Sequence, residues 1–423
     1  MTSQPVERTP IRSAADINLS DWDFWARPME EREHAFALLR GLETPAFFAE
    51  PESPFATPGA GYYALVRHAD IVEASRNPEI FCSGDGGSTN IIDMPAEFAE
   101  YFGSMINMDD PRHARLRRIV SRAFTPRMIK RFEADVEAAA ARIVDDLLEA
   151  GPGCDFVAEV AARLPLKIIC DMVGIPERDH GLVFDRSNII LGAGDSEYVA
   201  DQEAIATALL SAGMDLQQLV QELAAHRADN PTDDLTSALV NANIDGERLT
   251  AQELGSFFIL LVVAGNETTR NAISYGMRLL TLHPEQRRLW TDDLAARTPG
   301  AVEEIVRLAS PVNYMRRKVT RDHEMNGTLY RKGEKVVLYY WSANRDESVF
   351  NDPFRFDILR DPNPHLGFGG PGPHFCLGAH LARREISVMF RELLTRVPAI
   401  EVGEPEPLFS SFINGTKHMA CTF

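Results

Sequence analysis

The stretch FGGPGPHFCLG, residues Phe368 to Gly378, is the most informative segment of this 423-residue chain. Three glycines and two prolines precede Cys376, and this density excludes a regular helix or a central β-strand. The loop therefore delivers Cys376 to the start of a helix predicted for Leu377–Val397. A cysteine beside the free N–H groups of a helix N-terminus has a lowered pKa and favours the thiolate, which ligates iron. We interpret Cys376 as a metal ligand, although a cysteine taken alone would more often be an inert core residue.

A second segment, FFILLVVAGNETTRN from Phe257 to Asn271, places polar groups in the most apolar helix of the chain. Burying the carboxylate of Glu267 without a partner costs several kcal/mol, so its position needs a reason. One interpretation is a helix that emerges from the core at Glu267, with Thr268 capping the preceding turn. The other is a proton relay, in which Gly265 permits close approach to the backbone, Thr268 offers a hydroxyl and Glu267 connects to water.

The two segments together resemble the cytochrome P450 family of haem-thiolate monooxygenases. The family's F-x-x-G-x-H/R-x-C-x-G signature is matched by Phe368, Gly372, His374, Cys376 and Gly378. One more residue separates Phe368 from Gly372 than in the commonest form. The family's oxygen-binding A/G-G-x-D/E-T-T segment is matched by Ala264 to Thr269, with Glu267 in place of the commoner Asp. Glu304 and Arg307 match its ExxR pair, although such a pair taken alone would be an ordinary ion pair on a helix surface.

Further matches extend the resemblance over nearly the whole chain. The segment from Asn344 to Phe356 resembles the one that leads to the cysteine loop, and Arg317 occupies the position of a haem-propionate arginine. Three stretches are similar to mycobacterial methyl-branched lipid omega-hydroxylases: EYFGSMINMDDPRHARLR (100–117), LPLKIICDMVGIP (164–176) and SFFILLVVAGNETTRNAI (256–273).

The resemblance implies a mainly α fold with a minor β portion, in which haem lies between the long central helix and the helix after the cysteine loop. It implies heme b (iron protoporphyrin IX), with Cys376 as the iron ligand. The implied cofactor contacts are His113, Arg117, Ala264, Gly265, Arg317, Phe368, His374, Cys376 and Gly378. Thr268 is expected to hydrogen-bond bound dioxygen and Glu267 to deliver protons through water. Glu304 and Arg307 are expected to be structural.

Residues Arg112 to Arg131 form a basic segment with seven Arg, one Lys and no acidic residue. At helical spacing, His113, Leu116, Arg117, Val120 and Phe124 share one face. The opposite face carries Arg115, Arg118 and Arg122. His113 and Arg117 resemble the family's H-x-x-x-R pair, which would bind a haem propionate. The outer arginines are either a solvated face or, as the family implies, a docking patch for an acidic ferredoxin.

The overall composition fits a soluble globular protein, with 45% hydrophobic and 25% charged residues. A net charge of −19 argues against bulk affinity for nucleic acid. The longest apolar run is too short to span a membrane, and the N-terminus is polar with no signal-peptide pattern. Five widely spaced cysteines without a CxxC pair indicate neither a disulfide framework nor a zinc site. We therefore expect a reduced, cytoplasmic protein.

The order of predicted elements is mostly helical, without repeats or a long linker, so we expect a single domain over 1–423. Thr250 and Glu253 fit a capping box for a helix that ends before Pro284. Apolar residues at helical spacing predict two more helices, over 128–150 and 205–228. Strands are predicted at 62–66, 328–330 and 335–341, the last two joined through Gly333. Residues 412–416 are predicted as a hairpin tip with an Asn-Gly turn.

The substrate pocket is expected to be apolar, and each candidate lining residue could equally be plain core. The candidates are Met105, Ile106, Leu260, Val263, Val312 and Phe412. The similarity to lipid hydroxylases suggests oxidation at the end of a methyl-branched fatty or isoprenoid chain, with electrons from a ferredoxin and its reductase. Steroid side-chain hydroxylation is the alternative, because related enzymes share a long apolar channel. A haem-binding sensor or electron-transfer protein is an alternative of another class.

Overall fold

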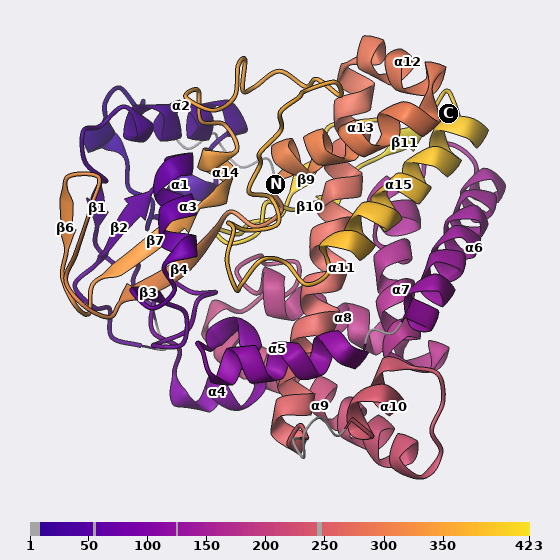
Figure 1. Cartoon of the computed structure of the whole chain (residues 1–423). Coiled ribbons are helices and arrows are strands. Elements are labelled where there is room, and N and C mark those ends of the chain that lie inside the picture. The colour runs from indigo at the N-terminus through magenta and orange to yellow at the C-terminus, as the bar shows by residue number, and fades with distance from the viewer. Residues whose placement is uncertain (1–8, 54–55, 124–125, 243–247) are drawn as a thin grey trace.

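A long central helix, α11 (Ala251–Leu282), separates a sheet-containing part from a helical part in the computed structural model (Figure 1). The structure describes residues 9–53, 56–123, 126–242 and 248–423. In Figure 1 the sheet and the N-terminal helices lie to the left of α11, and most of the long helices lie to its right. The predicted architecture, mainly α with a minor β portion, is confirmed.

The helices follow one another with short connections over most of the chain. The longer ones besides α11 are α2 Met29–Arg40, α3 His68–Arg76, α5 Arg112–Ala123, α6 Pro126–Ala150, α7 Arg163–Val173, α8 His180–Gly192, α9 Ile205–Asp229, α12 Pro284–Asp292, α13 Leu294–Ala309 and α15 Ala379–Arg396. The shorter ones are α1 Trp22–Trp25, α4 Ala96–Phe102, α10 Leu235–Val240, α14 Tyr340–Ala343, η1 Ala14–Asp16, η2 Met105–Asn107, η3 Val157–Ala161, η4 Glu177–Asp179 and η5 Gln202–Ala204.

The main sheet has the strand order β1-β2-β7-β4-β3 and combines segments from both ends of the chain. Its strands are β1 Phe47–Phe48, β2 Tyr62–Leu65, β3 Phe81–Cys82, β4 Tyr314–Val319 and β7 Lys335–Tyr339. Two-stranded pairs are formed by β5 His323–Met325 with β6 Thr328–Tyr330, β8 Glu401–Val402 with β11 Cys421–Thr422, and β9 Glu406–Pro407 with β10 Thr416–His418. Among the strands of the described residues, β2 and β7 alone pair in parallel.

Three strand predictions need correction. The central strand β4 was not predicted, and it pairs with β7 in place of β6. Residues Tyr340 and Trp341 are helical in α14, because the chain leaves the sheet after Tyr339. The hairpin predicted at 412–416 is present, because β9 and β10 pair antiparallel, but the Asn-Gly turn is not its tip: the connection is longer, and the N–H of Leu408 donates to the carbonyl of Gly415.

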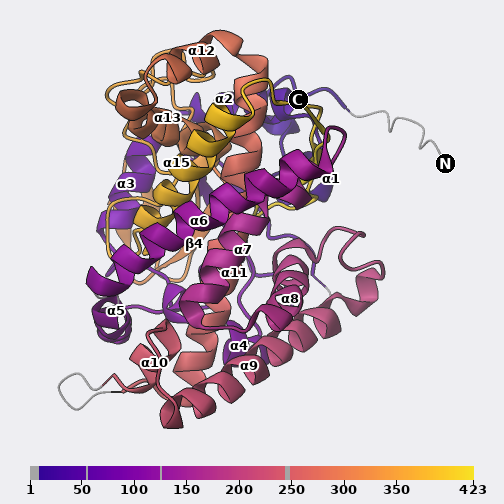
Figure 2. The ribbon, with the colours of Figure 1, turned by 90° about the vertical axis from the view of Figure 1, so that its right-hand side faces the viewer.

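Helix α11 is built as the sequence predicts. The Thr250 side chain accepts from the N–H of Glu253, and the Glu253 side chain accepts from the N–H of Thr250, so the capping box is present. The 32 residues span about 48 Å. Helices α7, α9, α13 and α15 all contact α11, and Figure 2 shows α6 and α7 crossing in front of it. These contacts join segments from both halves of the chain, and the single domain stays a prediction.

Close helix packing in the core depends on one glycine of α11. A Cβ added to Gly276 would lie 2.8 Å from the Phe390 ring of α15 and 3.0 Å from Ile305 of α13. Such distances are below normal carbon contact, so a larger residue at this position would force the Phe390 or Ile305 side chain to shift. Among the residues that the structure describes, every helix is too short or too polar to traverse a lipid bilayer.

Candidate functional site

The loop that carries Cys376 is held against α3 by its glycines. A Cβ on Gly372, whose φ is +152°, would lie 2.3 Å from the carbonyl oxygen of Ser75, and a Cβ on Gly370 would clash with the Ser75 hydroxyl. The N–H of Cys376 donates to the carbonyl of Phe368 over 3.0 Å. The glycine density noted in the sequence therefore has a steric cause at this contact.

The environment of Cys376 differs from the prediction in one respect. Desolvation raises the pKa of its thiol, and the N–H of Gly378 and the guanidinium groups of Arg117 and Arg383 only partly oppose this. The side chain remains accessible, although protein atoms surround it closely. Regular helix begins only at Ala379, with Gly378 as the N-cap. Cys376 therefore lies two residues before the N-cap of α15. The prediction that the helix N-terminus lowers the pKa of this thiol is therefore wrong; a bound metal ion would lower it.

Helix α5 brings His113 and Arg117 to this loop. The rings of His113 and His374 lie with their centroids 4.3 Å apart. Arg117 donates from Nη2 to the carbonyl of Phe375 over 2.7 Å. His113 is buried, and its Nδ1 lies 3.3 Å from an oxygen of Asp110. Its Nε2 has no hydrogen-bond partner among the described atoms.

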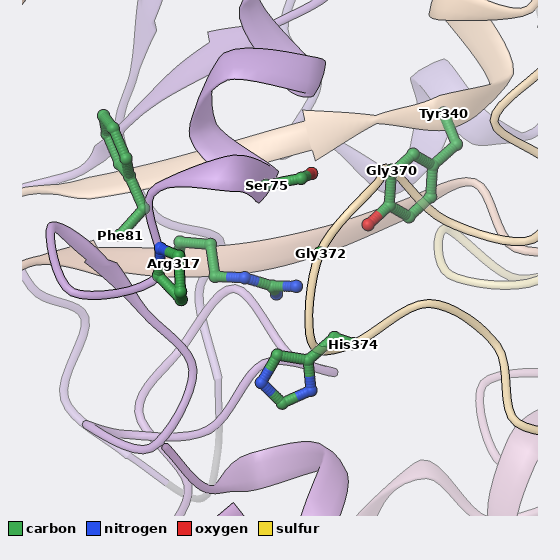
Figure 3. A pocket seen from close by; sticks show the side chains of 8 residues that line it. Ser75, Phe81, Arg317, Tyr340, Gly370, Gly372 and His374 are labelled. Carbon is green, nitrogen blue, oxygen red and sulfur yellow. The ribbon is translucent and has the colours of Figure 1, made fainter. Parts of the chain in front are cut away.

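Arg317 of β4 completes a cluster of positive groups beside the loop. Figure 3 shows Arg317 and His374 extending into the same space next to Gly372. Desolvation, followed by the charges of Arg317, His113 and Arg117, lowers the pKa of His374 to about 3. The guanidinium charges of Arg117 and Arg317, together with a buried ring nitrogen left unpaired among the described atoms, are suited to an anionic partner.

On the side of α11 that faces the site, two side chains are accessible to solvent, whereas the residue that precedes each of them in the helix is buried. Ala264 is exposed and Thr268 is partly exposed, whereas Val263 and Glu267 are buried. The Thr268 hydroxyl donates to the carbonyl of Ala264 over 2.7 Å. Gly265 has a different role, because a Cβ there would contact Ile169 of α7 at 3.2 Å. Its missing side chain serves helix packing.

Glu267 is fully buried, so the interpretation that α11 emerges from the core at this residue is wrong. Its Oε1 accepts from Arg270 and, over 3.1 Å, from Asn271. Arg270 also donates to the side-chain oxygen of Asn188 on α8 over 3.0 Å. The other oxygen, Oε2, and both polar atoms of the Asn266 side chain lack protein partners in the described part of the chain. Glu267 thus joins a buried polar cluster between α8 and α11.

Three residues of this region were missed by the sequence analysis. Arg270 and Asn271 stand three and four positions after Glu267, and this helical spacing could have identified them as its partners. Glu385 of α15 is also buried, and its side chain hydrogen-bonds Thr269. Desolvation raises the pKa of Glu385 to about 8. Its position four residues from both Leu381 and Met389 places it within the apolar face of α15.

Glu304 and Arg307 form a buried ion pair and not the exposed pair on a helix surface that their spacing alone suggested. Both side chains are fully buried and are joined by two hydrogen bonds of 2.7 Å. Arg307 also donates to the carbonyls of Asn344 and Pro353. Arg360 approaches Glu304 at 3.2 Å from the same segment. The pair therefore fixes the chain that leads into the cysteine loop.

The basic helix has the two predicted faces, with one correction. His113, Leu116 and Val120 are buried as predicted, and Phe124 lies outside the described residues. Arg115 does not belong to a free outer face, because it is half-buried and donates to Glu253 of α11 over 3.0 Å. Arg118 and Arg122 are exposed.

The substrate-pocket candidates fall into two groups. Met105, Leu260 and Val263 belong to or pack against one hydrophobic cluster, formed by α5, α7, α9 and α11. Val312 packs against a second hydrophobic cluster and Phe412 against a third. The two residues are nevertheless near each other, because Val312 forms a β-bridge with Ile413, which follows Phe412. Ile106 is half-buried, and its carbonyl accepts from Ser88. The structure therefore does not gather all six candidates in one cluster.

A cavity of about 430 Å³ opens between α4, the start of α5 and the start of α11. Its lining residues are Ala99, Gly103, Asn107, Met108, Arg112, Gln252, Glu253 and Ser256. It adjoins the segment that carries Met105 and Ile106, and its wall includes charged groups.

Comparison with known proteins agrees with these features. The family model described as Cytochrome P450 matches residues 298–414. A methyl-branched lipid omega-hydroxylase of Mycobacterium tuberculosis is 50% identical over 422 residues, which cover 99% of this chain and 96% of the relative. A steroid C26-monooxygenase of Mycobacterium bovis is 41% identical over 365 residues, covering 85% and 81%. The solved structure of a Mycobacterium marinum cytochrome P450 in complex with pseudoionone is 42% identical, with a TM-score of 0.91 and full coverage of both chains.

Proposed function

Because the chain belongs to the cytochrome P450 family of monooxygenases, we propose that it hydroxylates the terminal carbon of methyl-branched fatty or isoprenoid chains. The observation that carries this proposal is the 50% identity, over nearly its whole length, to relatives named as methyl-branched lipid omega-hydroxylases. The structural neighbour bound to pseudoionone adds support from a second source.

The residues of the site fit the haem that the family uses. Cys376 would ligate the iron, and the cluster of His113, Arg117, Arg317 and His374 would hold the carboxylates at the edge of the cofactor. The unpaired Nε2 of His113 and the depressed pKa of His374 are the observations that favour an anion there. Ala264 offers an accessible apolar surface on α11. Phe368 and Gly378 remain proposed cofactor contacts, and Gly265 would contribute only its backbone.

When bound, heme b supplies the reductive activation of dioxygen and the insertion of one oxygen atom into a C–H bond. We assign the handling of protons to this chain's own side chains. The Thr268 hydroxyl, now directed at the carbonyl of Ala264, would hold a proton at Oγ1 on the accessible face of α11. Glu267 would supply protons from the buried polar cluster through its unpaired Oε2.

Electrons would come from a ferredoxin and its reductase. The exposed Arg118 and Arg122 of α5 lie on the same helix as Arg117, which bonds the loop beside Cys376. A positive patch at this place would steer an acidic partner toward the cysteine side of the site. We also expect a cytoplasmic location, from the cysteine pattern of the sequence.

The second candidate is steroid side-chain hydroxylation, favoured by 41% identity to relatives named as steroid C26-monooxygenases. Both candidate reactions attack a primary C–H bond at the end of the substrate. They differ in the shape of the substrate that must enter the site. The family relationship and the enzymatic names of these relatives remove the support for a passive haem sensor.

The test offers a methyl-branched fatty acid and a sterol together to the holoenzyme with a ferredoxin, its reductase and NADPH. Mass spectra of the products are expected to show terminal hydroxylation of the branched acid in excess over the sterol. Preferred oxidation of the sterol would replace the first candidate by the second. Type I spectral titration with the two ligands, and with a linear fatty acid as the control, measures binding separately from turnover.

A further inference from the structure

Two cysteines far apart in the sequence meet at the edge of the core. The sulfur atoms of Cys154, which follows α6, and Cys421 of β11 lie 3.2 Å apart, and the two residues are 267 positions apart in the chain. Both are free thiols in this structure. We propose that Cys154 and Cys421 form a reversible disulfide bond, which makes this pair a redox-modification site separate from the proposed catalytic site.

The backbone places these residues opposite each other. Asp155 and Ala420 form an antiparallel bridge, which sets Cys154 directly across from Cys421. The N–H of Cys421 donates to the carbonyl of Cys154 over 2.9 Å, and the N–H of Phe156 donates to the carbonyl of Met419 over 2.8 Å. Opposed residues in an antiparallel pair have Cα atoms roughly 4.5–5.5 Å apart, which is within the range of natural disulfides. A bond of about 2.05 Å therefore needs the sulfur atoms to approach by only about 1 Å.

The two thiols differ in access, and this sets the order of reaction. Cys154 is partly exposed, whereas Cys421 is 1% exposed. Burial, the neighbouring Cys154 thiol and the charges of Asp155 and Glu159 raise the pKa of Cys421 to about 12. A small oxidant therefore meets Cys154 first, and Cys421 acts as the resolving thiol.

The reaction balances with a low-molecular-weight disulfide as the oxidant. The Cys154 thiolate attacks one sulfur of that disulfide, forms a mixed disulfide and releases the first small thiol. Cys421 then loses its proton and attacks Cys154 Sγ, which breaks the mixed bond and releases the second small thiol. Two protein thiols are oxidised and one small disulfide is reduced to two thiols. An excess of the small thiol reverses both steps.

The experiment equilibrates the full-length holoenzyme with graded ratios of oxidised to reduced glutathione. Free thiols are then blocked under denaturing conditions, and the peptides are mapped by mass spectrometry without reduction. The expected result is a peptide pair linked through Cys154 and Cys421 that rises with the oxidised fraction and disappears on reduction. The buried Cys82 and Cys170 are expected to remain alkylatable throughout.

Three variants sharpen the test. In Cys421→Ser, Cys154 is expected to keep one glutathionyl group, because no resolving thiol is present. In Cys154→Ser, Cys421 is expected to remain unmodified. Cys82→Ser is the matched control and should form the crosslink as the unmodified protein does. The oxidised form of the unmodified protein is also expected to melt a few degrees above the reduced form, and this difference should vanish in the two pair variants.

Lack of the linked peptide at every glutathione ratio, with both thiols still alkylatable, would overturn the proposal. So would stable glutathionylation of Cys154 in the unmodified protein, since it would show that Cys421 does not resolve the mixed disulfide. Both outcomes are read from the unmodified protein and do not depend on the folding of any variant or on its activity.

Discussion

Glu267 and Arg270 form an ion pair one turn apart in the buried centre of α11. Arg270 extends the pair to Asn188 on α8, so the carboxylate connects two helices that are distant in the sequence. A buried pair of this kind costs desolvation energy, and one unpaired oxygen of Glu267 remains. This arrangement is specific enough to test by a double-mutant cycle.

Arg270→Gln is expected to destabilise the holoenzyme by about 3–5 kcal/mol, because it leaves the Glu267 carboxylate buried without its cation. Glu267→Gln combined with Arg270→Gln should cost less than the sum of the two single changes. Urea unfolding of the four proteins gives the coupling energy. Additive effects would show that the two side chains do not act as a pair.

Thr268→Ala is expected to retain haem and substrate binding while less of the consumed oxygen appears as product. The change removes the hydroxyl that is proposed to hold a proton on the accessible face of α11, and it replaces a partly exposed side chain. Product formed per oxygen consumed is the measurement, and Thr268→Ser is the matched control, since it keeps the hydroxyl. Unchanged coupling in the alanine variant would remove Thr268 from this role.

The buried Glu385 carboxyl is expected to make the free energy of unfolding depend on pH. Its pKa is about 8 in the folded protein and near 4.5 when unfolded, so the folded state binds the extra proton between these values. The stability that this group contributes is fully present below about pH 4.5 and is lost as the pH rises through about 8, by several kcal/mol in total. Glu385→Gln should flatten this part of the profile. Urea unfolding across this pH range measures it, and an equal slope in both proteins would contradict the raised pKa.

The Glu304–Arg307 pair is expected to control haem retention. Arg307→Ala removes the hydrogen bonds to the carbonyls of Asn344 and Pro353 and leaves Glu304 buried, at a cost of about 3–5 kcal/mol. The ratio of haem absorbance to protein absorbance should fall sharply. Arg331→Ala, which breaks an exposed pair with Asp322, is the control and should leave the stability and the haem absorbance ratio nearly unchanged. Equal effects of the two changes would contradict the anchoring role.

Arg122→Glu is expected to slow ferredoxin-dependent reduction several-fold at low ionic strength, with the difference shrinking as salt is added. Arg178→Glu is the matched control, because Arg178 is highly exposed and lies in η4, outside the basic helix. Stopped-flow mixing under CO, which traps the reduced haem as it forms, measures the rate. A similar loss in both variants would indicate general charge repulsion and not a local docking patch.

Replacement of Cys376 by Ala should abolish the red-shifted ferrous-CO Soret band that thiolate ligation produces. A retained band would show that another side chain ligates the iron.

Features that depend on neighbours along the chain could be predicted from the amino-acid order. The capping box at Thr250, the irregular loop before Cys376 and the length of α11 were all predictable, because propensity, capping and glycine content act locally. Motif order placed His113, Arg317 and Cys376 in one expected site, and the structure brings these segments together.

Which distant groups meet, and how deeply they are buried, could not be predicted in this way. The strand β4, the partners of Glu267 and the pairing of Cys154 with Cys421 depend on contacts between segments up to 267 positions apart. The same holds for the raised pKa values of Cys376 and Glu385, since desolvation comes from atoms that other parts of the chain supply. Neighbouring residues in the sequence do not encode this buried environment, because it forms only when the chain has packed.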